Sequence, residues 1–305
     1  MNPDLSVRID KVKFSNPVLV ASGTFGYGEE YGSIFDLNKL GGIITKSITL
    51  NPREGHPPPR TCETSAGMLN CIGLANVGID RFIKEKLPFL RTLKTKVIVN
   101  VAGSSVEEYV KVVKRLEGKK VIDLLEINIS CPNVKEGGIV FGSNPESAYR
   151  CIKAVKENTS FPIIAKLSPN VSDIVEIALA ANEAGADAVS LINTLVGMAI
   201  DLETKKPRLT NITGGLSGPA IKPVALAMVW KVAQKVKIPI IGIGGIMNYQ
   251  DAIEFILAGA CMIQIGTGNF VDPECSIEIV EGLRKYCREN RIKKIGDLVG
   301  KLKTK

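Results

Sequence analysis

The 305-residue chain has one histidine, 5% aromatic residues and seven cysteines, none of them in a Cys-x-x-Cys pair. An odd cysteine count fits no disulfide framework, and a single histidine fits no Cys/His zinc site, so we expect no metal. This cysteine usage is typical of a reducing compartment and predicts a cytoplasmic protein. The net charge is +8. The basic residues are scattered and aromatic residues are too few for base stacking, so we expect no nucleic-acid partner.

Long apolar runs are also missing. No stretch approaches the roughly 20 apolar residues of a membrane helix, and the first residues contain no apolar signal-peptide core. We therefore expect a soluble, unprocessed protein without membrane contact. Hydrophobic residues nevertheless make up 45% of the chain, which is enough for a large core. Because α/β barrels often run to about 250 residues or more as one unit, we expect residues 1–305 to form a single domain.

Short β-branched runs recur along the chain, with helical segments between them. We expect strands at residues 17–21, 42–46, 96–101, 124–128, 163–167, 188–192, 240–243 and 262–265, and helices most clearly at 106–116, 145–157, 171–184, 220–236 and 249–258. Strands that alternate with helices pair in parallel, and eight such units predict an α/β fold, a (β/α)8 TIM barrel. The alternative is an open doubly wound sheet, but no Gly-x-Gly-x-x-Gly motif follows the first strand.

Two connections, residues 47–78 and 194–218, are too long to be plain turns. Both follow the carboxyl ends of strands, where barrel enzymes build their sites, so we expect inserted loops or strands that cover this face. His56 lies in the Pro-rich part of the first connection, without a second titrating residue nearby in the sequence. We therefore interpret it as a surface or loop-packing residue and not as a catalytic one.

Residues 124–133, Leu-Leu-Glu-Ile-Asn-Ile-Ser-Cys-Pro-Asn, begin as an apolar strand and end in a polar cluster. In an extended segment Glu126, Asn128 and Ser130 share one face. The sequence identifies no partner for the Glu126 carboxylate. Other strand ends carry polar residues or glycines, namely Lys46, Asn100, Lys166, Asn193, Thr194, Gly244, Gly245, Gly266 and Thr267. These residues predict an active site at the carboxyl ends of the strands.

The residue types suggest what this site binds. Lys46 and Lys166 end apolar strands, where a buried ammonium needs an anionic partner unless its side chain reaches the rim. Glycines after the last two strands favour a phosphate site over plain turns. Asparagine amides suit a ligand with amide or imide edges. Cys131 could be a packing residue, but its polar neighbours favour a reactive thiol. The other six cysteines are assigned to packing, Cys71 least clearly because it adjoins Asn70.

The motifs in combination resemble the class 1 dihydroorotate dehydrogenases. They are Asn-Ile-Ser-Cys-Pro-Asn at 128–133, Lys-Leu-Ser-Pro-Asn at 166–170, Asn-Thr at 193–194, Gly-Gly-Leu-Ser-Gly at 214–218 and the two glycine loops near 244 and 266. Residues 16–23 and 68–76 are most similar to the class 1B catalytic subunit. Class 2 enzymes differ, since they carry a serine base and a membrane-associating extension.

The resemblance implies an FMN-dependent oxidation of (S)-dihydroorotate to orotate in de novo pyrimidine (UMP) biosynthesis. Cys131 would be the base that removes the C5 proton while a hydride leaves C6 for FMN. Lys166 would stabilise negative charge on the reduced ring. The implied substrate-binding residues are Lys46, Asn70, Ile72, Gly73, Leu74, Asn128, Asn133, Asn193 and Thr194. The implied FMN-binding residues are Ala21, Ser22, Lys46, Asn100, Asn128, Lys166, Ile192, Gly218, Gly244, Gly245, Gly266 and Thr267.

The resemblance also implies a partner subunit with FAD and a 2Fe–2S cluster, which passes electrons to NAD in a heterotetramer of two catalytic and two electron-transfer subunits. A class 1A homodimer that uses fumarate is an alternative. A flavin-independent phosphate-binding aldolase or synthase, with Lys166 as a Schiff-base lysine, is another. A non-catalytic binding subunit would leave the polar strand ends unexplained. Gly137 and Gly138 make residues 135–142 a candidate lid.

Overall fold

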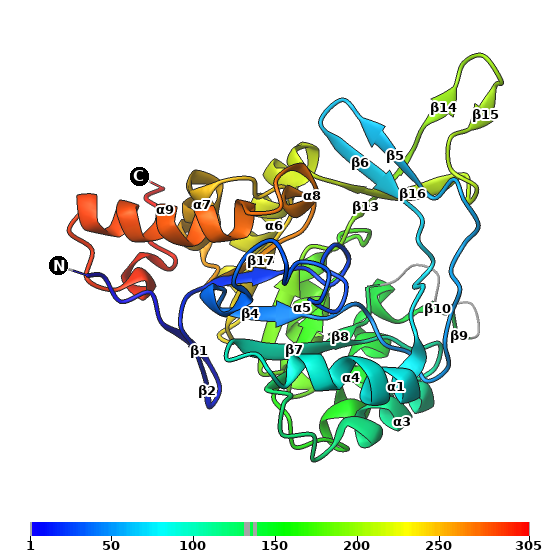
Figure 1. The fold of residues 1–305 in the computed structure, drawn as a ribbon, viewed down its shortest axis with the longest axis horizontal. Coiled ribbons are helices and arrows are strands. Elements are labelled where there is room, and N and C mark those ends of the chain that lie inside the picture. The colour runs from blue at the N-terminus through cyan, green and yellow to red at the C-terminus, as the bar shows by residue number, and fades with distance from the viewer. Residues whose placement is uncertain (1, 131–134, 137–138, 305) are drawn as a thin grey trace.

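The computed structural model describes residues 2–130, 135–136 and 139–304. Eight parallel strands close into a barrel, which confirms the predicted (β/α)8 architecture (Figure 1). The strands, in chain order, are β3 (Val18–Val20), β4 (Gly42–Ile44), β7 (Lys96–Val101), β8 (Leu124–Asn128), β11 (Ile163–Lys166), β12 (Ala188–Leu191), β17 (Ile240–Ile243) and β18 (Met262–Ile265). Their apolar side chains are buried on both faces, as expected for parallel strands between helices and a filled barrel interior.

Helices follow most barrel strands. They are α1 (Gly78–Arg81), continued through a π-helical turn at Phe82–Lys86 into α2 (Leu87–Leu90), then α3 (Val106–Leu116), α4 (Pro145–Lys156), α5 (Ile174–Glu183), α6 (Lys222–Ala233), α7 (Tyr249–Ala258), α8 (Gly268–Val271) and α9 (Cys275–Glu289). The helix expected from residue 171 begins at Ile174, because the Asp173 side chain accepts a hydrogen bond from the Val175 N–H and caps it.

Residues 78–90 and 275–289 are helical although the sequence did not single them out. In α9, Gly282 and several β-branched residues lower the intrinsic helix propensity. One face of α9 is nevertheless buried in the main core, including Ile279 and Leu283. Tertiary packing therefore stabilises a helix that local propensity alone does not predict.

A short hairpin seals the amino-terminal end of the barrel. It consists of β1 (Val7–Ile9) and β2 (Val12–Phe14). Ile9 and Phe14 pack in one buried cluster with interior residues of the barrel strands, such as Leu19 and Leu124. With this end filled by apolar side chains, a ligand site can only form toward the other end of the barrel.

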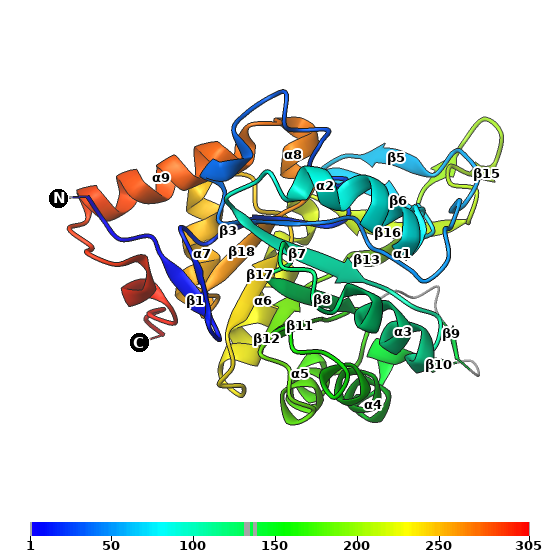
Figure 2. The same cartoon turned by 60° about the horizontal axis from the view of Figure 1, so that its bottom comes forward.

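A four-stranded antiparallel sheet, here called the cover sheet, lies at the opposite end from this hairpin in both views (Figures 1 and 2). Its strands, in spatial order, are β13 (Leu195–Met198), β16 (Thr213–Ser217), β6 (Gly67–Asn70) and β5 (Thr61–Thr64). Pairing of Gly215 with Asn70 joins the two long connections. This confirms that inserted segments cover the carboxyl-terminal face of the barrel.

Smaller hairpins complete the structure. β14 (Ile200–Asp201) pairs with β15 (Lys206–Pro207) at the tip of the second connection. β9 (Lys135–Glu136) pairs with β10 (Ile139–Val140). The lid predicted at residues 135–142 falls partly outside the described residues. Among the helices that are described, none has the length and apolarity needed to cross a bilayer.

Candidate active site

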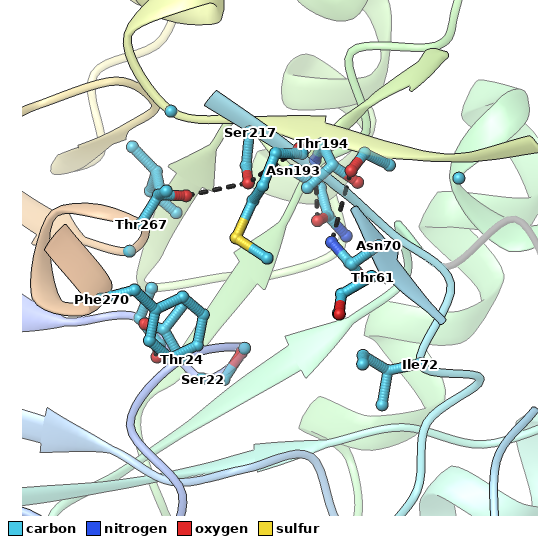
Figure 3. Close-up of a pocket in the computed structure, with 18 of the residues that line it drawn as sticks. Ser22, Thr24, Thr61, Asn70, Ile72, Asn193, Thr194, Ser217, Thr267 and Phe270 are labelled. Carbon is cyan, nitrogen blue, oxygen red and sulfur yellow. Dashed lines mark hydrogen bonds between the residues drawn. The ribbon is translucent and has the colours of Figure 1, made fainter. Parts of the chain in front are cut away.

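A cavity of about 800 Å³ lies where the carboxyl ends of the barrel strands meet the cover sheet. Figure 3 shows Ser217 and Thr267 toward one end of it, and Thr61, Asn70 and Ile72 toward the other. This volume lies within the range typical of small-molecule and cofactor sites. The residues on its wall form two different environments, one rich in glycine and hydroxyl groups and one rich in amides.

The structure gathers most of the predicted site residues on the wall of this cavity. These are Ala21, Ser22, Lys46, Asn70, Ile72, Gly73, Leu74, Asn128, Lys166, Ile192, Asn193, Thr194, Gly218, Gly244, Gly245, Gly266 and Thr267. Asn100 is different, because it is fully buried and is absent from the cavity wall. Cys131 and Asn133 lie outside the described residues. Their roles stay predictions.

Two asparagine side chains on the wall are joined by the Ser130 hydroxyl. This hydroxyl donates to Asn128 Oδ1 at 2.7 Å and accepts from Asn193 Nδ2 at 2.7 Å. Asn193 Oδ1 in turn accepts from the backbone N–H of Thr194 at 2.8 Å. Both amide oxygens are thus engaged within the chain. Each of the two amides keeps an N–H donor for a ligand, and such donors suit a ligand with carbonyl or carboxylate oxygens.

The amide-rich end is held in place by the cover sheet. Asn70, the last residue of β6, donates through Nδ2 to the Gly215 carbonyl at 3.3 Å (Figure 3). His56 lies behind the adjoining loop, where its Nδ1 is 2.8 Å from the Cys71 carbonyl oxygen. This contact confirms the loop-packing interpretation of His56. Cys71 is buried and contributes to the cavity wall.

The opposite end is built from glycines and hydroxyl groups. Thr267 Oγ1 donates to Ser217 Oγ at 2.8 Å (Figure 3). Gly245 has φ +71°, and a Cβ atom there would lie 2.8 Å from the Gly218 carbonyl oxygen, so the close approach of these two loops requires glycine. Gly266 differs, since a Cβ atom there would meet nothing closer than 3.7 Å. A side chain there would make only ordinary contacts, so the packing of the fold does not require glycine at this position, and a ligand that approaches the backbone closely would.

Lys166 lies buried at the floor of the cavity, at the end of β11. Its Nζ atom is 3.7 Å from Glu126 Oε2 and 3.4 Å from Ser22 Oγ. The anionic partner that a buried lysine requires is therefore Glu126, one of the residues whose role the sequence left open. Lys166 thus presents a fixed positive charge at the point where the barrel interior meets the cavity.

Lys46 is a second cation on the cavity wall, and it is only partly buried. Burial lowers the pKa of Lys46 from its usual value of 10.5, and the nearby Arg60 charge lowers it further. Glu30, also on the wall, opposes this decrease of the pKa. Among the residues that the structure describes, the cavity wall therefore holds three basic side chains and one acidic side chain, Glu30, a balance that favours an anionic ligand.

Several wall residues were missed in the sequence, among them Thr24, Tyr31, Arg60, Thr61 and Ser217. Most come from irregular loops or from the cover sheet, which show no periodicity that could reveal which side they face. Ser190 and Gln264, the buried partners of Glu126, could have been found. Each is a single polar residue inside an apolar strand, which is the same signal that drew attention to Glu126.

Comparison with known proteins assigns the chain to a family. The family model described as dihydroorotate dehydrogenase matches residues 4–287. The chain is 58% identical over 302 residues to a protein of Geotalea uraniireducens, covering 99% of both chains, and 58% identical over 300 residues to one of Geobacter metallireducens, covering 98% of both. A protein of Geobacter sulfurreducens is 56% identical over 300 residues, with 98% of both chains covered. All three are named dihydroorotate dehydrogenase B (NAD(+)), catalytic subunit. The chain belongs to the dihydroorotate dehydrogenase family.

Proposed function

We propose that this chain oxidises (S)-dihydroorotate to orotate with FMN, in de novo pyrimidine biosynthesis. The single observation that carries the proposal is one cavity with an open, glycine-lined end, a buried lysine at its floor and fixed amide donors at its other end. The glycine-lined end suits the phosphate of FMN, the lysine suits its ring, and the amide donors suit a small acid with carbonyl oxygens. When bound, FMN would supply the acceptor for the hydride that leaves C6 of the substrate.

The residues of the chain have separate roles in this proposal. The Cys131 thiolate takes the proton from C5 of dihydroorotate. Asn128 and Asn193 donate hydrogen bonds to oxygens of the substrate, since their own amide oxygens are engaged within the chain. Lys46 attracts the substrate anion, and Lys166 stabilises negative charge that develops at the floor of the cavity.

FMN would be held mainly by backbone groups and short side chains. Gly218, Gly244, Gly245, Gly266 and Thr267 would surround its phosphate, with Ser217 beside them. Ala21, Ser22, Asn128, Ile192, Lys46 and Lys166 would surround its ring, and Asn100 would lie behind them, against Glu126. Closing the cavity between barrel and cover sheet excludes water from the reacting atoms, which strengthens the electrostatic effect of both lysines.

The electron acceptor in this proposal is NAD. The relatives' names contain both "NAD(+)" and "catalytic subunit", which supports a separate subunit that takes electrons from FMN. We propose that this partner carries FAD and a 2Fe–2S cluster, and that two of each subunit form a cytoplasmic heterotetramer in which residues 1–305 act as one domain. A fumarate-using class 1A homodimer is less well supported, because the relatives carry the NAD-linked name.

The cofactor proposal is tested by the visible absorption spectrum of the purified chain, followed by mass analysis of the released ligand. We expect the visible absorption bands of an oxidised flavin, and release of FMN and not FAD. A colourless protein that forms a borohydride-trapped adduct at Lys166 would instead support the aldolase or synthase alternative.

Replacing Ser130 with alanine is expected to weaken orotate binding about fivefold to 100-fold, because the amides of Asn128 and Asn193 lose their common partner and can turn. FMN binding should change little. The matched variant Ser217→Ala, at the other end of the cavity, should instead weaken FMN binding and spare orotate. Titration with orotate, followed by the visible spectrum of the flavin, measures the orotate affinity of both variants. Equal orotate affinity in Ser130→Ala and wild type would contradict the role of the hydroxyl.

Lys46 should give orotate binding a pH dependence at alkaline pH. The protonated ammonium attracts the orotate anion, so its contribution is complete below the lowered pKa of Lys46 and is lost as pH rises through it. The ratio of wild-type to Lys46→Met affinity cancels the titration of the ligand itself. This ratio should fall at a lower pH than the ordinary lysine value of 10.5. Arg60→Gln should move the fall to higher pH, and an unchanged ratio throughout would contradict the role of Lys46.

A further inference from the structure

Glu126 is a fully buried carboxylate in the interior of the barrel, on β8. It lies between two other inward-facing residues of the same strand. Leu124 belongs to the apolar cluster at the sealed end, and Asn128 lines the cavity. Glu126 is absent from the cavity wall, so it contacts no ligand there. Its charge nevertheless lies just behind the floor of the site.

Side chains from four other barrel strands meet at this carboxylate. Asn100 Nδ2 donates to Oε2 at 2.6 Å, while Ser190 Oγ and Gln264 Nε2 donate to Oε1 at 2.8 and 2.6 Å. The Lys166 ammonium is 3.7 Å from Oε2. A buried carboxylate without partners would be very unfavourable, and here three hydrogen-bond donors and one cation replace the water that the carboxylate has lost. Apolar side chains could have filled the same space, so the charge calls for an explanation.

The amides around Glu126 are oriented by its carboxylate. Asn100 Oδ1 and Gln264 Oε1 are buried, and neither has a hydrogen-bond partner among the described residues. Both amides turn their N–H groups to Glu126 and leave their oxygens unpaired, which is unfavourable for acceptors removed from water. The arrangement is therefore organised around a negative charge.

We propose that Glu126 is a positioning residue that balances the charge of the flavin site. It holds the Lys166 ammonium at the cavity floor, and its own negative charge offsets part of the lysine's effect. The reduction potential of bound FMN is thereby lower than Lys166 alone would set it. This keeps the reduced cofactor able to pass electrons to a low-potential acceptor such as NAD, so the inference rests on the proposed function.

The test is the midpoint potential of bound FMN in Glu126→Gln, measured by anaerobic dye titration of the holoprotein. The new amide has nearly the shape of the carboxylate, and the unpaired oxygens of Asn100 and Gln264 can accept its N–H group after the amides turn, so the variant should fold. Removing the negative charge should favour reduction at least tenfold, a rise of about 30 mV for a two-electron couple. An unchanged or lower potential would overturn the proposal.

Three further variants separate charge balance from a structural effect. Lys166→Met should lower the midpoint potential, and adding Glu126→Gln to it should raise the potential again and tighten FMN binding about tenfold. Ser190→Ala removes one hydrogen bond from Glu126 without removing charge, and it should leave the potential near the wild-type value. If Ser190→Ala shifts the potential as much as Glu126→Gln, the effect is structural and the proposal is wrong.

The inference can fail separately from the proposed function. The chain could bind FMN and be reduced by dihydroorotate while Glu126→Gln leaves the midpoint potential unchanged. That result would overturn only the role of Glu126. A chain that binds no flavin would overturn the proposed function itself.

Discussion

Replacing Cys131 with alanine is expected to slow reduction of bound flavin by dihydroorotate by about 10²- to 10⁴-fold at neutral pH. The C5 proton then loses its proposed acceptor, and general base catalysis contributes an effect of this size. FMN should remain bound, because the FMN-binding residues named above do not include Cys131. Anaerobic stopped-flow absorbance measures the reductive step directly, without a contribution from the electron acceptor.

A matched control is Cys62→Ala. Cys62 lies on β5 in the cover sheet and is absent from the cavity wall. Its substitution removes a thiol from the chain without touching the proposed base, so the reductive rate should stay close to wild type. If Cys131→Ala reduced its flavin at the wild-type rate, another group would have to accept the proton.

Replacing Lys166 with methionine is the second large effect we expect. The change leaves the Glu126 carboxylate buried without its cation, and breaking a buried pair in this way costs about 3–5 kcal/mol of unfolding free energy. The site also loses its fixed positive charge, so FMN should bind more weakly and its midpoint potential should fall. Denaturant unfolding of the apoprotein measures the first effect, and fluorescence and dye titrations measure the other two.

Lys153→Met provides the comparison for this experiment. Lys153 forms an ion pair with Glu157 at 3.4 Å on the exposed face of α4, and both side chains are about half exposed. Pairs of this kind contribute about 0–1 kcal/mol. Equal losses of stability in the two variants would show that the buried pair has no special role, and unchanged flavin affinity and potential in Lys166→Met would contradict its proposed function.

The barrel could be predicted from the sequence because its signal is local. Each of its strands is a short apolar run, and four carry β-branched residues at most positions. The expected strands therefore agree with the observed ones to within two residues at each end. The residues at the strand ends then follow from the fold, because all parallel strands end at the same face. This is why Asn193 and Lys166 could be assigned to one site before the structure was known.

Ser190 and Gln264 stand out in the sequence as polar residues inside apolar strands, but their pairing with Glu126 could not be predicted, because it depends on barrel closure. Ser190 and Gln264 are 64 and 138 residues away in the chain, and they reach the same carboxylate only when the strands take their register. The strand pairing of the cover sheet could not be predicted for the same reason, since it joins Asn70 and Gly215 from separate connections. Contacts of this kind leave no periodic pattern in the sequence.

The central claim is that this chain oxidises dihydroorotate with FMN, and anaerobic mixing of the FMN-loaded protein with (S)-dihydroorotate tests it most directly. We predict loss of the oxidised flavin absorbance together with formation of one equivalent of orotate per flavin, without any added electron acceptor. Flavin that stays oxidised in the presence of this substrate would contradict the account.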